Sequence, residues 1–482
     1  MSYFSKNKRN DSWRIWLAIF IIAELLSWLA FNFSQLNLLI LSLVGLSTIV
    51  LSLKNPIYTL FLPLAELFWG SLGHSFYYGV LNTRLVVFIS VIFVFVIQLF
   101  LGRRQLKIKT NKSLWFIWLL ILLLVVGGIV LAYYERYAPI DIFLDANAYL
   151  YLLYLPVWYQ FYDAKYLTEV VDILKAAALV IALKTLVMFN IFAQEYSWLD
   201  MNSIYKWIRD TRTGEITFFY GNFWRIFMQS QVYLIAAWFI IFIKQLREYQ
   251  NGGNFIYLSI LTTALYISLS RSFWLGLVVG LIFLLVHLII YQKKQIFFLS
   301  GLLLGSLVLS SFILLQLFLN VPQWKRLASL SQRGIDTAEP AANSRLQLLA
   351  PLWQAIKEQP IVGYGFGKKL TYYSVDPRIK NEQNPEGLHT TYAFEWGWLD
   401  QWLKSGIFFI VLMWSWIILI YNRGYRVLAG RPEILLPILA TLTSLVVIHI
   451  FTPFLNHPLG LGLLMLITII SFSYGQESKS YR

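Results

Sequence analysis

Two arginines stand out because each lies at the end of an apolar stretch. Arg225 opens the apolar run over residues 223–243, and Arg271 lies in the short turn between the runs over 255–269 and 272–291. Ionisable side chains close to a membrane interior are costly and are therefore functional candidates. A planar guanidinium binds phosphate through paired donors, which suits a lipid-linked pyrophosphate. The alternative is that both arginines only extend to lipid phosphates at the membrane surface.

A histidine supplies the third candidate for chemistry. His389 lies in Gly-Leu-His-Thr-Thr-Tyr, shortly before another apolar run. An imidazole can accept a proton near neutral pH, as a general base for a sugar hydroxyl must. The alternatives are a surface histidine without a role, or Glu395 as the base. Glu395 and Asp400 also fit a helix start, where the helix dipole alone favours carboxylates.

A glycine-rich segment over residues 361–367 reads Ile-Val-Gly-Tyr-Gly-Phe-Gly. It lacks the Gly-x-Gly-x-x-Gly spacing and the alternating strands and helices of a nucleotide-binding loop. We expect a turn after a helix, in which Gly365 and Gly367 leave backbone N–H groups free to bind an anion. Together with Arg345, these glycines are our candidates for substrate binding.

The sequence predicts neither a metal site nor a cofactor. The chain has no cysteine and five histidines, and no two histidines have the His-x-x-x-His spacing. Cysteine thiolate ligands and thiolate catalysis are therefore excluded, and a histidine-based metal site is not expected.

The composition is that of a membrane protein. Of the 482 residues, 58% are hydrophobic and 13% are charged, whereas a soluble domain has about 25% charged residues. The net charge of +15 comes from basic residues dispersed between apolar runs. This pattern fits contact with anionic lipid better than binding of nucleic acid, which we do not expect.

The apolar runs predict an all-α polytopic fold with about fourteen transmembrane helices, within a range of 12–14. Two runs are weak: the third contains Pro56, Pro63 and Glu66, and the sixth contains Asp145 and Pro156. Glu24 and Glu66 lie within runs and are expected to hydrogen-bond between helices. The runs cover residues 13–31, 36–53, 56–73, 84–101, 114–134, 145–161, 170–192, 223–243, 255–269, 272–291, 296–319, 399–421, 434–451 and 457–474.

The basic residues predict the orientation in the inner membrane. With fourteen spans and a cytoplasmic N-terminus, most Lys and Arg fall in cytoplasmic connections, as the positive-inside rule requires. Both termini are then cytoplasmic. The short outside connections hold only Arg136, Lys206, Arg209, Arg212 and Arg271.

The orientation divides the chain into three parts. Residues 1–319 hold about eleven spans, residues 320–398 form one large extracytoplasmic loop with short helices, and residues 399–482 hold three spans. Within the loop, 343–358 has helical spacing of apolar residues, with Leu346, Leu349, Trp353 and Ile356 on one face. Ser344 is the expected N-cap, and Pro351 is expected to interrupt or kink this helix.

The order of these motifs resembles that of the O-antigen ligase and polymerase family over roughly residues 220–410. The resemblance rests on the Ser-Arg-Ser turn at 270–272, on Asn343-Ser344-Arg345, on the glycine-rich segment, and on His389 before a span. It differs at Thr390, where the family usually has Asn after the histidine, and in the two N-terminal spans beyond the family's usual twelve.

The resemblance implies a function as well as a fold. Members of this family are helical membrane glycosyltransferases that move a glycan from undecaprenyl pyrophosphate to an acceptor on a sugar, lipid or protein. They act at the outer face of the cytoplasmic membrane, with inversion and without a metal. The resemblance further implies that Arg225, Arg271 and His389 are the functional residues. Ligase and polymerase remain equal alternatives, and a transporter or flippase of lipid-linked oligosaccharide is the competing class.

Overall fold

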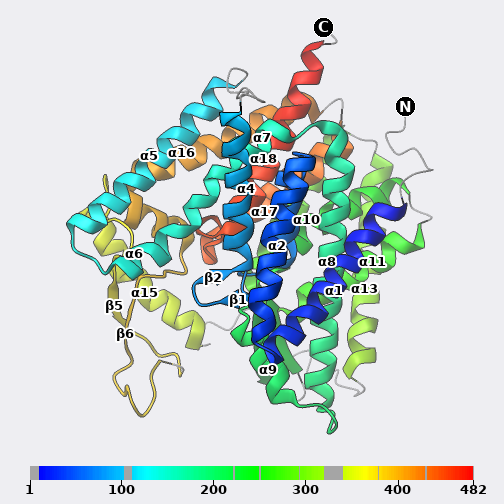
Figure 1. The fold of residues 1–482 in the computed structure, drawn as a ribbon. Helices are drawn as coiled ribbons and strands as arrows, with labels where there is room; N and C mark the ends of the chain where they lie inside the picture. Colours follow the sequence, from blue (N-terminus) through cyan, green and yellow to red (C-terminus); the bar gives the residue numbers. More distant parts are fainter. Residues whose placement is uncertain are drawn as a thin grey trace.

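The computed structural model describes residues 10–101, 111–220, 223–248, 251–291, 294–319, 340–377, 379–428 and 431–480, and this part of the chain is mostly helical (Figure 1). The N-terminal α-helices are α1 (Asn10–Asn32), α2 (Gln35–Lys54), α3 (Tyr58–Trp69), α4 (Thr83–Phe100), α5 (Lys112–Tyr134), α6 (Pro139–Ala146), α7 (Tyr154–Phe161), α8 (Leu167–Gln194) and α9 (Met201–Asp210). The later ones are α10 (Val232–Arg247), α11 (Gly252–Ile267), α12 (Arg271–Tyr291), α13 (Lys294–Leu319), α15 (Pro340–Glu358), α16 (Gly397–Leu428), α17 (Pro432–Phe451) and α18 (Pro458–Ser480).

Each predicted span contains helix in the described chain. Ten helical segments are long and apolar enough to cross a membrane. Four shorter apolar helical stretches are Tyr58–Trp69, Gly252–Ile267, Phe298–Phe312 within α13 and Pro458–Tyr474 within α18. The weak sixth segment is one of the ten, although it is divided into α6, the 3-10 helix η2 (Asn147–Leu153) and α7. The structure supports a polytopic helical protein, and the number fourteen remains a prediction.

The mostly helical structure fits the predicted all-α polytopic fold, and the described chain adds three short antiparallel hairpins to it. They are β1 (Tyr77–Tyr78) with β2 (Leu81–Asn82), β3 (Gly214–Tyr220) with β4 (Phe223–Met228), and β5 (Leu370–Tyr373) with β6 (Leu388–Thr391). Aromatic and β-branched residues favour strands, and β3 and β4 are rich in them. Pairing in a hairpin satisfies their backbone groups outside the helices.

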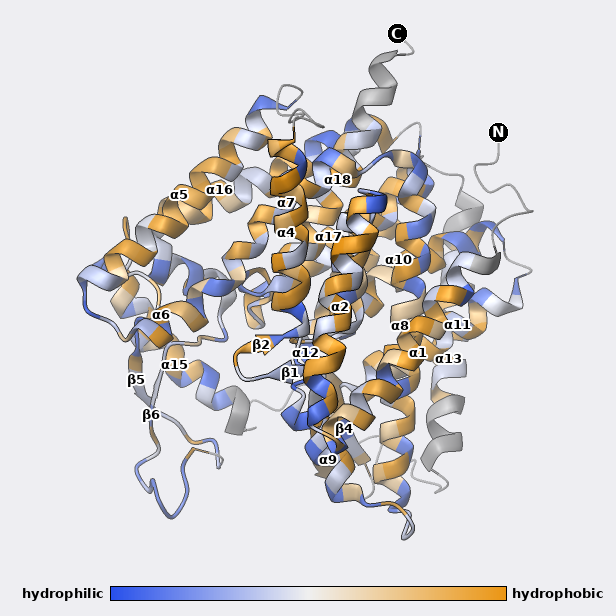
Figure 2. Cartoon of the chain, in the orientation of Figure 1, coloured by the Kyte–Doolittle hydropathy of each residue, from blue (hydrophilic) through white to orange (hydrophobic). Residues whose placement is uncertain are grey.

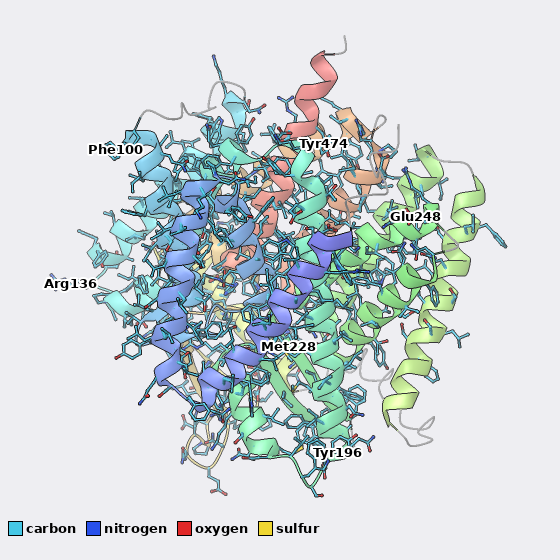
Figure 3. The ribbon with its side chains drawn as sticks, turned by 45° about the vertical axis from the view of Figure 1, so that its right-hand side comes forward. Phe100, Arg136, Tyr196, Met228, Glu248 and Tyr474 are labelled. Carbon is cyan, nitrogen blue, oxygen red and sulfur yellow. The ribbon has the colours of Figure 1, made fainter. Side chains whose placement is uncertain are left out.

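The two ends of the molecule are formed by different segments of the chain. The helices carry an apolar band between more polar ends (Figure 2). Phe100, Glu248 and Tyr474, at the ends of predicted cytoplasmic connections, lie toward one end, and Tyr196, in a predicted outside segment, lies at the other (Figure 3). Hairpin β5–β6 and helix α9 also lie toward the end that holds Tyr196 (Figure 1).

Two carboxylates within spans have the partners that were expected between helices. Glu24 on α1 forms an ion pair with Lys184 on α8 at 2.7 Å and accepts a hydrogen bond from Trp69 Nε1 at 2.9 Å. Glu66 on α3 accepts from Nε of Arg84 on α4 at 3.0 Å. Ionisable groups that are removed from water are retained mainly when they are paired, and these pairs join neighbouring helices.

Glycines allow the close contact that positions Arg271. Gly276 and Gly280 are one helical turn apart on α12 and face α17, where a Cβ atom on either would collide with Ile448 or Ser444. Ser444 Oγ donates to the carbonyl oxygen of Gly276 at 2.7 Å. Small residues spaced four apart permit such backbone approach between membrane helices.

The helix predicted over 343–358 is present, but its start and its course at Pro351 differ from the prediction. Helix α15 begins at Pro340, so Ser344 lies inside it and is not the N-cap, and the helix continues through Pro351. Its buried residues are Ser344, Leu348, Leu352, Ala355 and Ile356, whereas Leu346 and Trp353 are exposed. The first part of the predicted loop, 320–339, lies outside the described residues.

Candidate active site

Arg225 lies on a strand, which corrects the prediction that it opens a membrane helix. Strand β4 places it opposite Thr217 of β3, and α10 begins only at Val232, after the short 3-10 helix η4 (Gln229–Gln231). The Phe-Trp-Arg-Ile-Phe sequence is as favourable for a strand as for an apolar helix. The pairing with β3 decides between them.

Several neighbouring groups hold the Arg225 guanidinium. Its Nε donates to the carbonyl oxygen of Ser268 at 3.0 Å, and Nη1 lies 3.4 Å from Oε2 of Glu215. The guanidinium carbon is 5.1 Å from the centre of the Phe227 ring. The side chain is still 29% exposed. Arg225 is therefore oriented by the protein and remains accessible to an anion.

Arg271 is the exposed first residue of α12, and a tight turn leads to it. Leu269 in this turn has a positive φ of 47°. Ser270 N–H donates to Ser268 Oγ at 3.2 Å, and Ser272 Oγ lies 2.9 Å from Thr452 Oγ1. Because Arg225 binds the carbonyl of Ser268, the structure brings this arginine against the turn that leads to Arg271.

His389 lies on strand β6 of the loop hairpin and is half-buried. It is the cross-strand partner of Tyr372, and the two ring centres are 5.7 Å apart at an interplanar angle of 82°. The Tyr372 hydroxyl lies 3.2 Å from Ser344 Oγ on α15. The imidazole is thus supported by a hairpin that is packed on α15.

Arg345 follows Ser344 on α15 and forms an ion pair with Glu395. Trp396 Nε1 donates to the carbonyl oxygen of Arg345 at 2.9 Å. Both side chains of the ion pair are about half exposed, with 45% for Arg345 and 49% for Glu395. These contacts join α15 to the segment between β6 and α16, next to the hairpin that carries His389.

The glycine-rich segment does not form the expected anion cradle, because its amides already have acceptors. Gly365 N–H donates to the carbonyl oxygen of Lys404 at 3.0 Å, and Gly367 N–H donates to Oδ2 of Asp145 at 2.7 Å. Both glycines have positive φ, and a Cβ atom at Gly365 would collide with the backbone of α5. Their glycine identity is explained by backbone conformation and close packing.

Helix α16 is broken where it meets this segment. Gly406 has φ 74° and ψ 177°, values that are outside the helical region. The carbonyl of Leu403 accepts from Tyr364 N–H at 2.8 Å, and Ile407 N–H donates to the carbonyl of Pro360 at 3.0 Å. The glycine-rich segment therefore satisfies backbone groups that the break leaves without partners within the helix.

An ionic group that was not predicted from the sequence lies beside this break. Lys404 on α16 is buried, with Nζ 2.5 Å from Oδ1 of Asp145 on α6 and 2.5 Å from Oδ1 of Asp400 on its own helix. A signal was present, because Asp400 and Lys404 are four residues apart in a predicted span. Opposite charges with this spacing lie on one helix face, and charges in a span require partners.

The same group contacts the turn between α17 and α18. Asn456 Nδ2 donates to Oδ2 of Asp400, and Gln401 Nε2 donates to the carbonyl of Leu455 at 3.3 Å. Thr452 at the start of this turn contacts Ser272, as described above. A continuous set of contacts therefore runs from Asp400 to the Arg271 turn.

The surroundings of the hairpin shift the pKa of one tyrosine hydroxyl upward. Burial raises the pKa of Tyr392, and the nearby carboxylates of Asp145 and Asp141 raise it further. Tyr392 comes three residues after His389 and directly follows strand β6, and like any tyrosine it is neutral near pH 7. Within the described residues, no group of three or more His, Asp or Glu side chains could hold a metal ion.

The predicted residues thus form two groups. Arg225 and the Arg271 turn form one, on hairpin β3–β4 and the start of α12. His389 and Arg345 belong to the other, on hairpin β5–β6 and α15. The turn over 452–457 and the ionic group at Lys404 lie between the two groups in the contact network.

Part of the chain matches a known family. Residues 256–414 match the family described as O-Antigen ligase, and this segment contains Arg271, Arg345 and His389, whereas Arg225 precedes it. No curated protein and no solved structure matches the chain.

Proposed function

Because the chain carries a domain of the O-antigen ligase family in a multi-pass membrane protein, we propose that it is a membrane glycosyltransferase. It moves a glycan from undecaprenyl pyrophosphate to an acceptor hydroxyl at the outer face of the cytoplasmic membrane. The acceptor is a sugar on another lipid-linked repeat, on a lipid or on a protein.

The reaction is a single displacement with inversion, and it needs no metal. The acceptor oxygen attacks the anomeric carbon while the bond from that carbon to the pyrophosphate oxygen breaks. His389 takes the proton of the acceptor hydroxyl as a general base. The electron pair of the broken bond leaves with undecaprenyl pyrophosphate, whose growing negative charge Arg225 and Arg271 stabilise.

The observation that best supports this proposal is the approach of hairpin β3–β4 to the Arg271 turn. Arg225 reaches that turn through its hydrogen bond to Ser268, although 46 positions separate the two arginines in the sequence. A partly exposed guanidinium held by neighbours is preorganised, so it loses little freedom when charge develops beside it. An arginine that only contacts lipid needs no such fixed partners.

The orientation that we propose puts both arginines and His389 on the outside. The termini are then cytoplasmic, and residues 320–398 face the outer side of the membrane. The gathering of Tyr196, α9 and hairpin β5–β6 toward one end of the molecule supports this arrangement (Figures 1 and 3).

The test uses the purified chain in proteoliposomes with an undecaprenyl-pyrophosphate-linked oligosaccharide and candidate acceptors. We expect release of undecaprenyl pyrophosphate together with a glycosylated acceptor. A flippase would move the donor across the bilayer with its glycosidic bond intact. Glycan profiles of a deletion strain identify the acceptor: loss of chain length indicates a polymerase, and loss of glycan from its final carrier indicates a ligase.

A further inference from the structure

A buried lysine lies between two aspartates at the break in α16. The exposed fractions of the side chains are 4% for Lys404, 9% for Asp145 and 5% for Asp400. A buried ionic group is expensive to form and is weak evidence for stability alone. Its fixed geometry instead specifies how the elements that supply the three charges are placed.

One side of this ionic group holds both ends of the His389 hairpin. Asp145 Oδ2 accepts from Gly367 N–H, three residues before β5 begins, and Asp141 on the same helix pairs with Lys369 at 2.6 Å. On the other end, Phe394 follows β6 and is buried, with its ring centre 5.3 Å from Lys404 Nζ.

The other side reaches the Arg271 turn. Asp400 accepts from Asn456, in the turn over 452–457. Thr452 of that turn contacts Ser272, and Phe454 packs on Phe273 with ring centres 5.6 Å apart. Asp400 and Lys404 both precede the break at Gly406, on one helical segment, so their ion pairs join the Asp145 side directly to the side that holds the turn over 452–457.

We infer that Asp145, Lys404 and Asp400 form an ionic clamp that sets the position of the His389 hairpin relative to the Arg271 turn. They are positioning residues, since none of them belongs to either of the two groups of proposed active-site residues. This inference rests on the proposed function for its effect on turnover. Its structural part, the distance between the two segments, is independent of any activity.

The distance can be measured directly because the chain has no cysteine. We would attach spin labels at Thr390→Cys beside His389 and Leu275→Cys one turn after Arg271, both exposed positions. The clamp variant combines Lys404→Met with Asp145→Asn and Asp400→Asn, which leaves no unpaired buried charge. The matched control is Lys184→Met with Glu24→Gln, a partly buried ion pair between helices.

We expect a narrow distance distribution in the parent chain and in the control, and a broad or displaced one in the clamp variant. A clamp variant that stays folded and keeps the parent distribution overturns the inference. If the clamp variant does not fold, Asp145→Asn alone is measured, because it retains the Lys404–Asp400 pair and weakens the contact to α6. An unchanged distribution in that variant overturns the inference as well.

Turnover provides a second measurement. A displacement of about 1 Å in a catalytic group can cost roughly 10²-fold in rate, so the clamp variant should lose about that factor in kcat. Its KM for the lipid-linked donor should change little, because the arginines are untouched, and the control should retain both constants. If the parent chain transfers no glycan, the proposed function fails while the distance measurement still decides the clamp.

Discussion

Arg225 donates a hydrogen bond from Nε to the carbonyl oxygen of Ser268 at 3.0 Å. This contact joins a strand residue to the turn in which Arg271 follows three residues later. The two guanidinium groups therefore come from elements that are held against each other, as a shared anion requires.

Replacement of either arginine should lower turnover. Loss of one preorganised donor at a developing anion costs roughly 10²–10³-fold in rate, so Arg225→Ala and Arg271→Ala should each lose about that factor. Lysine keeps the charge but lacks paired planar donors, so Arg225→Lys and Arg271→Lys should be impaired less. The measurement is glycan transfer by purified, folded protein with a lipid-linked donor.

The control for the arginines is Arg209 on α9, an exposed residue that pairs with Asp210 at 2.7 Å. Arg209→Ala and Arg209→Lys should retain the parent turnover. Full activity of both Arg225→Lys and Arg271→Lys would contradict a paired phosphate contact and favour arginines that only reach lipid.

His389→Ala should fold and bind the donor but lose roughly 10²–10⁴-fold in turnover, the usual contribution of a general base. The hairpin should persist, because its backbone pairing does not need the imidazole. His74→Ala, another histidine of the predicted outer side, is the control and should keep its activity. Near-parent turnover of His389→Ala would show that the residue only packs on Tyr372.

Accessibility should follow the predicted orientation. In intact cells, a membrane-impermeant maleimide should label Ser197→Cys, next to Tyr196, and Glu382→Cys in the large loop. It should label Glu248→Cys only after permeabilisation, since that residue lies toward the opposite end of the molecule (Figure 3). The reverse pattern would place His389 in the cytoplasm and remove the basis for an outer-face reaction.

Gly406→Ala should destabilise the protein. The backbone at Gly406 has φ 74° and ψ 177°, and an added Cβ would collide with the carbonyl of Ile361. This backbone region is essentially restricted to glycine, and a strained residue there costs of order 1–3 kcal/mol. The measurement is thermal unfolding in detergent, where the midpoint should fall. Gly127→Ala on α5 has open space at its Cβ and should show no loss.

Several features of this fold were predictable because their causes are local in sequence. An apolar run must become a helix in the membrane to satisfy its own backbone, so every predicted span contains helix. It was also predictable that Glu24 and Glu66 would each have a partner on another helix, since an unpaired charge in a span is costly. Arg271 and His389 became candidates through residue type and order, and both lie within the segment that matches the family, while their chemistry stays a prediction.

Other features depended on partners that are distant in sequence. Residues 223–228 could form helix or strand by their apolar character, and the pairing with β3 placed Arg225 on a strand. Gly365 and Gly367 lie in a segment with the composition of an anion-binding turn. Their amides, however, donate hydrogen bonds to the carbonyl of Lys404 and the carboxylate of Asp145. A free donor cannot be distinguished from a satisfied one until its neighbours are known.

The sequence by itself determined that this chain crosses the membrane many times and which residue types could perform glycan transfer. This was possible because hydrophobicity and charge are local properties of each segment and do not depend on its partners in the fold. Only the tertiary structure decided that Arg225 meets the Arg271 turn and that Lys404 lies between Asp145 and Asp400. Those contacts join residues up to 259 positions apart, and such pairings are set by the packing of whole helices.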